Sequence, residues 1–292
     1  MKKTTKKILI VYPWANIDTN PTMSLILKQL SEQGFFIDVL CKKSNDFLMP
    51  NDLDGKIRYL YESDLFYVID GGKIAVTAAR IRRFWASIKG RKRFKAIIGV
   101  DPEGLILAHE LNSHAKHPLA YVSFEIFFRD ELFTPREISL KDKELKASKD
   151  VSIVLVQDEE RANALANENC FASDIFVLAP NSPTPVPVPS SNYLREELNI
   201  GIDKKIVLFA GSLEEWSSRD FMEEMVQNWP MDFVLVIHSR RVVNKRMQLF
   251  FDQLEQTGKI YISRKLFPQN HMSELVASAD FGLAPYRQTP DG

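Results

Sequence analysis

Two acidic residues follow neighbouring apolar runs and are placed to carry out acid–base chemistry. Asp101 comes directly after the run Ala96–Val100, and Glu125 follows the run Leu119–Ser123. Because parallel strands end at the same edge of a sheet, both carboxylates are expected at one carboxyl edge. There they could orient or deprotonate a hydroxyl group. For Asp101 the alternative is that it only caps the helix that follows.

A second set of residues could bind a diphosphate. Gly211 and Ser212 follow the apolar run Lys205–Ala210, where glycine permits close approach and backbone N–H groups at a helix start suit an anion. A structural turn is the alternative for this junction. The cations and the histidine expected at the same edge are Arg219, His238, Arg240 and Lys245. They would match the charge of a nucleotide diphosphate, although solvated surface charge is the alternative for most of them.

The first junction between a strand and a helix, residues 12–22, contains no glycine. A dinucleotide fold needs glycines at this position so that the backbone can approach the pyrophosphate, so a dehydrogenase that uses NAD or FAD is disfavoured. The junction instead offers Trp14 and Asn16, which could contact an acceptor. Trp14 could equally form a lid on the core.

Composition excludes several other classes of protein. The 292 residues include 38 basic and 38 acidic ones, a balance that argues against a protein that coats nucleic acid. Two cysteines, Cys41 and Cys170, cannot form a disulfide framework. The five histidines show no metal-ligand spacing, so we predict no metal site. No apolar run approaches the roughly 18 residues of a membrane helix, and we expect a cytoplasmic protein.

Short apolar runs alternate with amphipathic segments along the chain, which predicts α/β architecture with two Rossmann-like, doubly wound parallel sheets. We expect a first domain over residues 1–182, a linker over residues 183–191 and a second domain over residues 192–292. The linker contains four prolines at alternate positions, which disfavour a helix or a central strand. An edge strand or a surface loop is the alternative for that segment.

The segment Arg80–Lys95 is the densest basic feature of the sequence. Ile81, Phe84, Trp85 and Ile88 form one helical face within it, so this face would pack on the sheet while the basic face is solvated. An alternative is that the basic face contacts an anionic membrane, at about 1 kcal/mol per cation near the surface. The protein would then be peripheral at the inner face of the membrane.

The chain resembles the retaining glycosyltransferases of the GT-B fold, family 4 type. The motifs that carry the resemblance are the opening strand Lys7–Tyr12, the pair Val100-Asp101, the segment Tyr121–Glu125, the turn Phe209–Leu213 and the segment Leu275–Pro285. The family often has His-Asp at the second of these motifs and Asp-Ser-His-Glu at the third. The resemblance spans nearly the whole chain.

The sequence departs from this family at two places. The family histidine falls on Phe124, while the glutamate that follows it is retained as Glu125. The family's pair of glutamates eight residues apart should follow Pro285, and the sequence ends before them. We therefore expect the second domain to be truncated.

The resemblance implies transfer of a sugar from a nucleotide-diphosphate sugar to an acceptor hydroxyl, with retention, in polysaccharide or lipid-linked saccharide synthesis. It implies that Arg219, Arg240 and Lys245 hold phosphate, that Ser212 donates to it and that Phe267 lies near the base. Asp101 and Glu125 would face the acceptor. No cofactor and no metal are implied, because protein cations neutralise the leaving diphosphate. Two alternatives are a non-catalytic nucleotide-sugar-binding or scaffold relative and a nucleotide-sugar epimerase of the same fold.

Overall fold

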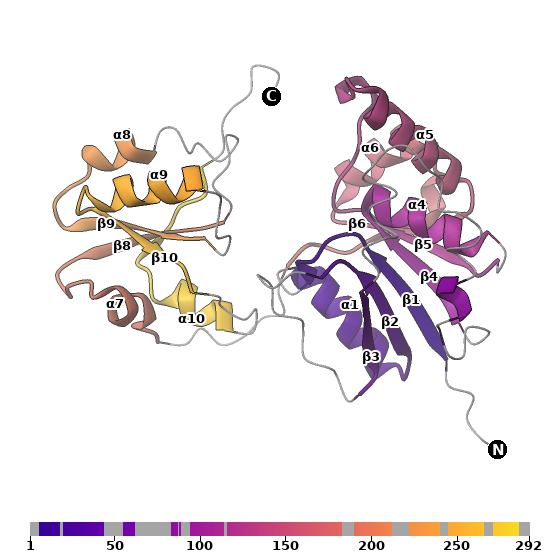
Figure 1. Ribbon diagram of the computed structural model, residues 1–292, viewed down its shortest axis with the longest axis horizontal. Coiled ribbons are helices and arrows are strands. Elements are labelled where there is room, and N and C mark those ends of the chain that lie inside the picture. Colours follow the sequence, from indigo (N-terminus) through magenta and orange to yellow (C-terminus); the bar gives the residue numbers. More distant parts are fainter. Residues whose placement is uncertain are drawn as a thin grey trace. The chain divides into compact units, whose positions relative to one another are not determined.

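The protein divides into two compact units, Met1–Thr184 and Pro185–Gly292, each of which is described by itself (Figure 1). The computed structural model describes residues 6–17, 20–43, 55–61, 83–86, 88, 94–113, 116–182, 190–211, 222–239, 245–265 and 271–285. Residues 183–189 of the expected linker lie outside this set.

The first unit is built on a parallel sheet that has seven strands among the described residues. The strands are β1 (Lys7–Tyr12), β2 (Phe36–Cys41), β3 (Ile57–Tyr61), β4 (Phe94–Val100), β5 (Leu119–Val122), β6 (Val151–Val156) and β7 (Phe176–Leu178). Their order is β3-β2-β1-β4-β5-β6-β7, so the chain winds outward from β1 in one direction and then from β4 in the other. The point where the direction reverses, between β1 and β4, is where open α/β sheets bind ligands.

Helices cover both faces of this first sheet (Figure 1). The helical elements are α1 (Pro21–Glu32), α4 (Asp101–Asn112), η3 (Arg129–Glu131), α5 (Pro135–Ser148), α6 (Glu159–Asn169) and η4 (Ser173–Ile175). The α1 helix packs its buried Met23 and Leu27 on one face, whereas α4, α5 and α6 pack on the other. Because both faces are covered, the strands are apolar along most of their length.

Part of the basic segment packs on the second of these faces. Phe84, Trp85 and Ile88 are buried in the same core cluster as α4. The indole Nε1 of Trp85 donates to the carbonyl of Leu111, 2.9 Å away. The apolar side of this segment therefore serves the fold, as its helical spacing predicted. Its other cations lie outside the described residues, Arg83 and Lys95 excepted.

The α4 helix lies unusually close to β1, because Gly104 leaves no side chain between them. A Cβ atom at this position would lie 2.6 Å from the carbonyl oxygen of Val11 and 3.2 Å from Cδ of Pro13. Gly99 on β4 is packed as tightly against the backbone of Leu105, with a Cβ distance of 2.5 Å to its Cα. These contacts fix the first turn of α4 at the carboxyl edge of the sheet.

Gly104→Ala is therefore expected to lower the free energy of unfolding by about 1–3 kcal/mol, since the methyl group would push α4 away from β1. This outweighs the gain of about 1 kcal/mol that alanine usually brings to a helix interior. Urea denaturation measures the change. Gly282→Ala is the matched control, because nothing lies within 4 Å of its Cβ position. Equal stability of the Gly104 variant and the wild type would contradict the tight packing.

The second unit repeats the same plan with a four-stranded parallel sheet among its described residues. The strands are β8 (Lys205–Ala210), β9 (Phe233–His238), β10 (Ile260–Ser263) and β11 (Phe281–Gly282), in the order β10-β9-β8-β11. The helices are α7 (Tyr193–Leu198), α8 (Met222–Gln227), α9 (Lys245–Glu255) and α10 (Met272–Ala277). The core on one face includes α8 and α9, and the core on the other includes α7 and α10 (Figure 1).

Asp280 joins β11 to the rest of the second unit. Its carboxylate accepts a hydrogen bond from the backbone N–H of Ile206 at 2.8 Å and forms ion pairs with Arg195 and Lys205, each at 3.2 Å. Arg195 lies on α7, and Lys205 and Ile206 lie on β8, so one carboxylate connects this helix and this strand to the start of β11. This explains why an aspartate stands immediately before so short a strand.

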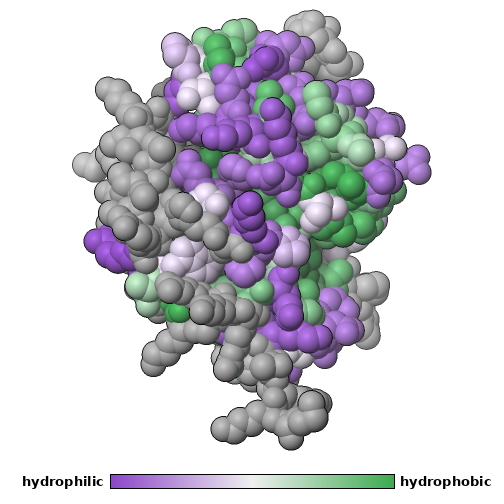
Figure 2. Space-filling view, turned by 90° about the vertical axis from the view of Figure 1, so that its right-hand side faces the viewer, coloured by the Kyte–Doolittle hydropathy of each residue, from purple (hydrophilic) through white to green (hydrophobic). Residues whose placement is uncertain are grey.

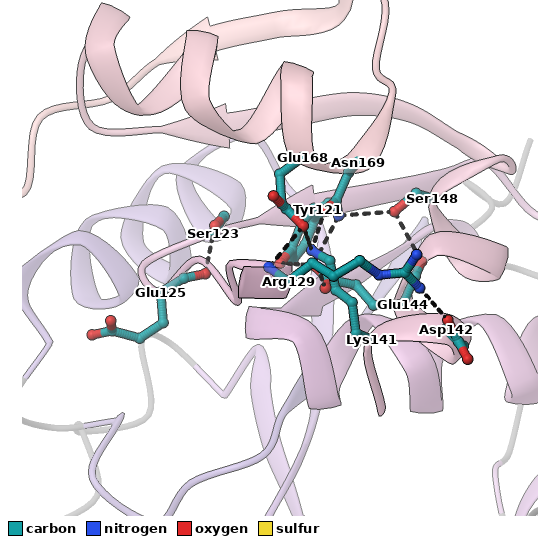
Figure 3. Close-up of polar contacts among 10 residues, drawn as sticks. All are labelled: Tyr121, Ser123, Glu125, Arg129, Lys141, Asp142, Glu144, Ser148, Glu168 and Asn169. Carbon is teal, nitrogen blue, oxygen red and sulfur yellow. Dashed lines mark hydrogen bonds and ion pairs between the residues drawn. The ribbon is translucent and has the colours of Figure 1, made fainter. Parts of the chain in front are cut away.

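A buried polar cluster crosslinks β5, α5 and α6 in the first unit (Figure 3). Lys141 and Glu144 have no exposed side-chain surface and form an ion pair of 3.0 Å. Lys141 also donates to Asn169 at 2.6 Å, and the hydroxyl of Tyr121 donates to Glu144 at 3.1 Å. Asn169 donates to Glu144 as well, at 2.8 Å. Every charge in this cluster thus has a partner, as a buried ion pair requires.

The predicted fold class is confirmed: both units are parallel, doubly wound α/β domains. In the part of the chain that the structure describes, no helix is long and apolar enough to cross a membrane. Among the coloured residues in Figure 2, hydrophilic ones predominate, and the hydrophobic ones form their largest group toward the right, with smaller groups elsewhere.

Candidate functional site

Asp101 lies at the reversal point of the first sheet, directly after β4 and next to the end of β1. Its side chain is almost completely buried, with 4% of the residue surface exposed. Its backbone has a φ of 55°, in the left-handed region that side-chain-bearing residues seldom adopt. Such a conformation costs about 1–3 kcal/mol and persists only where the surrounding structure enforces it.

Three donors hold the Asp101 carboxylate. The backbone N–H groups of Phe124 and Glu125 donate to Oδ1 at 2.8 and 3.1 Å, and the indole Nε1 of Trp14 donates to Oδ2 at 3.2 Å. The N-cap of α4 is Val100, and the three donors to the Asp101 carboxylate lie outside the helix, so Asp101 does more than cap it. The carboxylate instead connects the loops that follow β1 and β5.

The surroundings of Asp101 raise the pKa of its carboxyl group from 3.8 to about 6. Burial is the main cause, because a carboxylate loses hydration in the interior. The hydrogen bonds from Phe124, Glu125 and Trp14 oppose the shift, and the negative charge of Glu125 adds to it. A group with this pKa is mostly ionised at neutral pH and can still accept a proton, as a general base must.

Trp14→Phe is expected to raise the pKa of Asp101 further, because it removes one hydrogen bond to the carboxylate. The loss of one bond of this strength corresponds to an increase of about 0.5–1 pH unit. The pKa can be measured by NMR titration of the Asp101 carboxyl carbon. Trp85→Phe is the matched control, because its indole donates to a backbone carbonyl instead. An unchanged Asp101 pKa in Trp14→Phe would show that the bond is not formed in solution.

Glu125 contributes its backbone to this site and sends its side chain into solvent. Its N–H holds Asp101, and its carbonyl accepts from the hydroxyl of Ser123 at 2.9 Å. Figure 3 shows the Glu125 carboxylate pointing away from the buried cluster around Lys141. The two predicted acids therefore meet at one loop, with one carboxyl group buried and the other exposed.

Trp14 and Asn16 lie on the loop that follows β1. Trp14 is 40% exposed, so it does not form a closed lid on the core. The Asn16 side chain is half-buried, and its Oδ1 accepts from the hydroxyl of Tyr12 at 3.2 Å. Trp14 thus shares a site with Asp101 and presents part of its ring to solvent, where it could contact a ligand.

Sequence reasoning missed two residues that support the Phe124–Glu125 loop. The guanidinium of Arg161 donates to the carbonyl of Phe124, and Nε2 of Gln157 donates to the carbonyl of Ser123 at 2.9 Å. Both lie after β6, which pairs with β5. The sequence signal was that both residues follow the apolar run of β6. Residues that follow neighbouring parallel strands meet at one edge of the sheet, so they could have been expected near the end of β5.

The carboxyl edge of the second sheet holds two of the residues expected to bind the donor. The N–H of Gly211, after β8, donates to the carbonyl of His238 at the end of β9, 3.3 Å away. His238 is 3% exposed, and its Nδ1 lies 3.0 Å from the hydroxyl of Ser263 on β10. Three strand ends therefore meet here, with backbone and imidazole groups joined by hydrogen bonds.

The other predicted donor-binding residues are not placed. Ser212, Arg219, Arg240 and Phe267 lie outside the described residues, and Lys245 begins α9 without a described side chain. Within the residues that are described, no group of three His, Cys, Asp or Glu side chains is arranged to hold a metal ion.

No protein-family model and no curated protein sequence matches this chain. Solved structures share its fold. The sucrose-phosphate synthase of Thermosynechococcus elongatus is 12% identical with a TM-score of 0.62, and the match covers 98% of this chain and 77% of that one. HepE of Anabaena, in complex with UDP-glucose, is 11% identical with a TM-score of 0.65, and the match covers 94% and 72%.

A putative UDP-N-acetylglucosamine 2-epimerase of Listeria monocytogenes also shares the fold. It is 13% identical with a TM-score of 0.57, and the match covers 96% of this chain and 74% of that one. The protein therefore has the fold of the GT-B glycosyltransferases, as the sequence resemblance predicted, and an epimerase uses the same fold.

Proposed function

We propose that this protein is a hexosyltransferase that moves a sugar from a nucleotide-diphosphate sugar to an acceptor hydroxyl with retention of the anomeric configuration. The observation that carries the proposal is the buried, strained Asp101 at the reversal point of the first sheet, held by three donors from two loops. Strained residues with shifted pKa values concentrate at functional sites. HepE, which has a similar fold, was solved with UDP-glucose.

In this proposal the first unit binds the acceptor. The acceptor O–H bond breaks, and its oxygen bonds to the anomeric carbon on the same face from which the diphosphate oxygen leaves, so the bond to that oxygen breaks with retention of configuration. Asp101 orients the acceptor hydroxyl and accepts its proton, while Glu125 faces the acceptor from the exposed side of the loop. Trp14 and Asn16 contact the acceptor ring. The acceptor is a polysaccharide or a lipid-linked saccharide at the cytoplasmic face of the membrane, with the basic segment Arg80–Lys95 in peripheral contact.

The second unit binds the donor in the same proposal. Gly211 and Ser212 form the turn that receives the diphosphate, and His238 supports this turn through its carbonyl. Arg219, Arg240 and Lys245 neutralise the leaving nucleotide, and Phe267 lies near the base. These cations replace a metal ion, so we expect transfer to need neither a metal nor a cofactor.

The test is a panel of UDP-, GDP- and ADP-sugars with mixed saccharide acceptors. Release of free nucleotide that depends on an acceptor is the expected result, with an unchanged rate in EDTA and a product whose anomeric coupling in NMR matches that of the donor. Nucleotide-sugar binding without turnover would favour a scaffold role instead.

An epimerase remains the second candidate, favoured by the shared fold of the Listeria protein. It would interconvert sugar epimers of the nucleotide-sugar without any acceptor. NMR of the sugar ring after incubation with the donor alone distinguishes this outcome, since a transferase leaves the configuration of the donor ring unchanged.

A further inference from the structure

Two successive peptide groups in the loop after β5 bind the buried Asp101 carboxylate. The first joins Ser123 to Phe124, and the second joins Phe124 to Glu125. Their N–H groups donate to the same oxygen of Asp101, Oδ1, at 2.8 and 3.1 Å. In a trans peptide the C=O group lies opposite the N–H group. The carbonyl oxygens of both peptide groups are therefore directed away from Asp101, where other donors can reach them.

Gln157 and Arg161 supply those donors, one for each peptide group. Nε2 of Gln157 donates to the Ser123 carbonyl at 2.9 Å. The guanidinium of Arg161 donates to the Phe124 carbonyl. Each chain of hydrogen bonds thus begins at a side chain, passes through one peptide group and ends at Oδ1 of Asp101. Hydrogen bonds in a chain polarise one another, so a donor at the carbonyl makes the N–H of the same peptide group a stronger donor.

The position of Arg161 is unfavourable for its own helix. It lies in the first turn of α6, where the helix dipole favours acids such as Glu159 and Glu160 and disfavours a cation. Among the residues that the structure describes, its guanidinium pairs with no carboxylate and donates only to the Phe124 carbonyl. Local rules are broken mainly where a residue serves a function elsewhere, and here the charge is directed to the loop that holds Asp101.

We propose that Arg161 and Gln157 are positioning residues that keep the Asp101 carboxylate ionised and oriented for the acceptor hydroxyl. They act through two peptide groups and not on the acceptor itself. This inference rests on the proposed function, since it gives both residues a part in that reaction. Arg161 has the larger effect, because a hydrogen bond from a charged donor is stronger than one from a neutral amide.

Other ionisable groups surround Asp101 and act on its charge. The negative charge of Glu125 raises the Asp101 pKa. Tyr121 interacts with Asp101 as well, and burial raises the Tyr121 pKa well above its usual range, so this phenol stays neutral near pH 6. Glu103 lies in the first turn of α4, and Lys42 lies over the indole ring that donates to Asp101. None of these groups changes in the variants below, so a shift in pKa is due to the side chain that is replaced.

NMR titration of the Asp101 carboxyl carbon in the full chain, without substrate, tests the inference. The signal is identified by its loss in Asp101→Asn. Arg161→Met should raise the Asp101 pKa by about 0.5 pH unit or more above its value of about 6, because the N–H of Glu125 becomes a weaker donor. Gln157→Leu should raise it by about half as much. Arg161→Lys should recover most of the shift, since lysine keeps the charge and can donate.

The pH profile of kcat/KM gives a second readout. Its acid limb should move to higher pH by the same amount as the Asp101 pKa. A purely structural role would lower stability and leave the limb in place. Arg136→Met is the matched control, because Arg136 is an exposed arginine in the first turn of α5 and should change neither readout.

An unchanged or lowered Asp101 pKa in Arg161→Met would overturn the inference, and so would an equal increase in Arg136→Met. If Arg161→Met does not fold, Arg161→Gln gives the same comparison, with a smaller increase expected because glutamine keeps a donor without the charge. The titration needs no substrate. A raised pKa in a protein that releases no nucleotide from any donor would remove the transferase proposal and leave the connection to Asp101 standing. Turnover with an unchanged pKa would do the reverse.

Discussion

Asp101→Asn is expected to lower kcat/KM for transfer by about 10²–10⁴-fold, the usual contribution of a positioned general base. Asparagine has nearly the same shape and can still accept from the N–H groups of Phe124 and Glu125. It cannot take up a proton, and its amide N–H₂ would face the indole donor of Trp14. Nucleotide release at saturating donor and varied acceptor concentration measures the effect.

Asp130→Asn is the control for this substitution, because Asp130 is an exposed acid on η3 in the same unit. If Asp101→Asn and Asp130→Asn both keep the wild-type kcat/KM, Asp101 takes no part in the reaction. Circular dichroism of both proteins separates lost chemistry from lost structure.

The raised pKa of Asp101 also predicts how stability depends on pH. The folded state holds the proton up to a pH of about 6, whereas the unfolded chain releases it near 3.8. The stabilising contribution of this group is therefore complete below pH 3.8 and is lost as pH rises to about 6. The loss is about 3 kcal/mol, and it should be absent in Asp101→Asn. In contrast, activity should rise as the pH passes about 6, where the base ionises in the folded protein.

Lys141→Met should have the largest effect on stability, a decrease of about 3–5 kcal/mol in the free energy of unfolding. Methionine fills a similar volume but leaves the Glu144 carboxylate buried without its cation. It also removes a donor from Asn169. Urea denaturation of the full chain, monitored by circular dichroism, measures the change in the stability of the first unit.

Lys146→Met is the matched control, since this lysine lies on the exposed side of the same helix and should change stability by less than about 0.5 kcal/mol. Adding Glu144→Gln to Lys141→Met should recover part of the loss, because no unpaired buried charge then remains. If the double variant is less stable than Lys141→Met alone, the ion pair does not account for the effect.

The positions of the strands of the first unit along the sequence were predictable, because parallel strands buried on both faces are nearly continuous apolar runs. Glycine commonly follows the end of a helix in the left-handed conformation, and Gly34 adopts a φ of 83° directly after the C-cap of α1. The strand β11 covers only Phe281–Gly282, although apolar residues continue to Ala284. In this case Asp280 is a side-chain anchor that precedes the strand.

The candidate site was predictable in its position but not in its geometry. Asp101 and Glu125 were placed at one edge by the strands that precede them. The left-handed φ of Asp101 and the exposed direction of Glu125 depend on contacts with the loop after β1 and with residues after β6. The burial of Lys141 was not predictable either, because two of its partners, Glu168 and Asn169, come from α6 and are distant in sequence.

Because Trp14 donates a hydrogen bond to Asp101, the fluorescence of Trp14 should report the ionisation of the candidate base. Indole emission responds to the charge of a group bound at Nε1, so Trp14 fluorescence can follow Asp101 in the absence of any substrate. The chain has four tryptophans, of which Trp85 is buried in the core. A variant that keeps Trp14 alone would be an optical sensor of this one acid, useful for screening ligands before a donor or an acceptor is known.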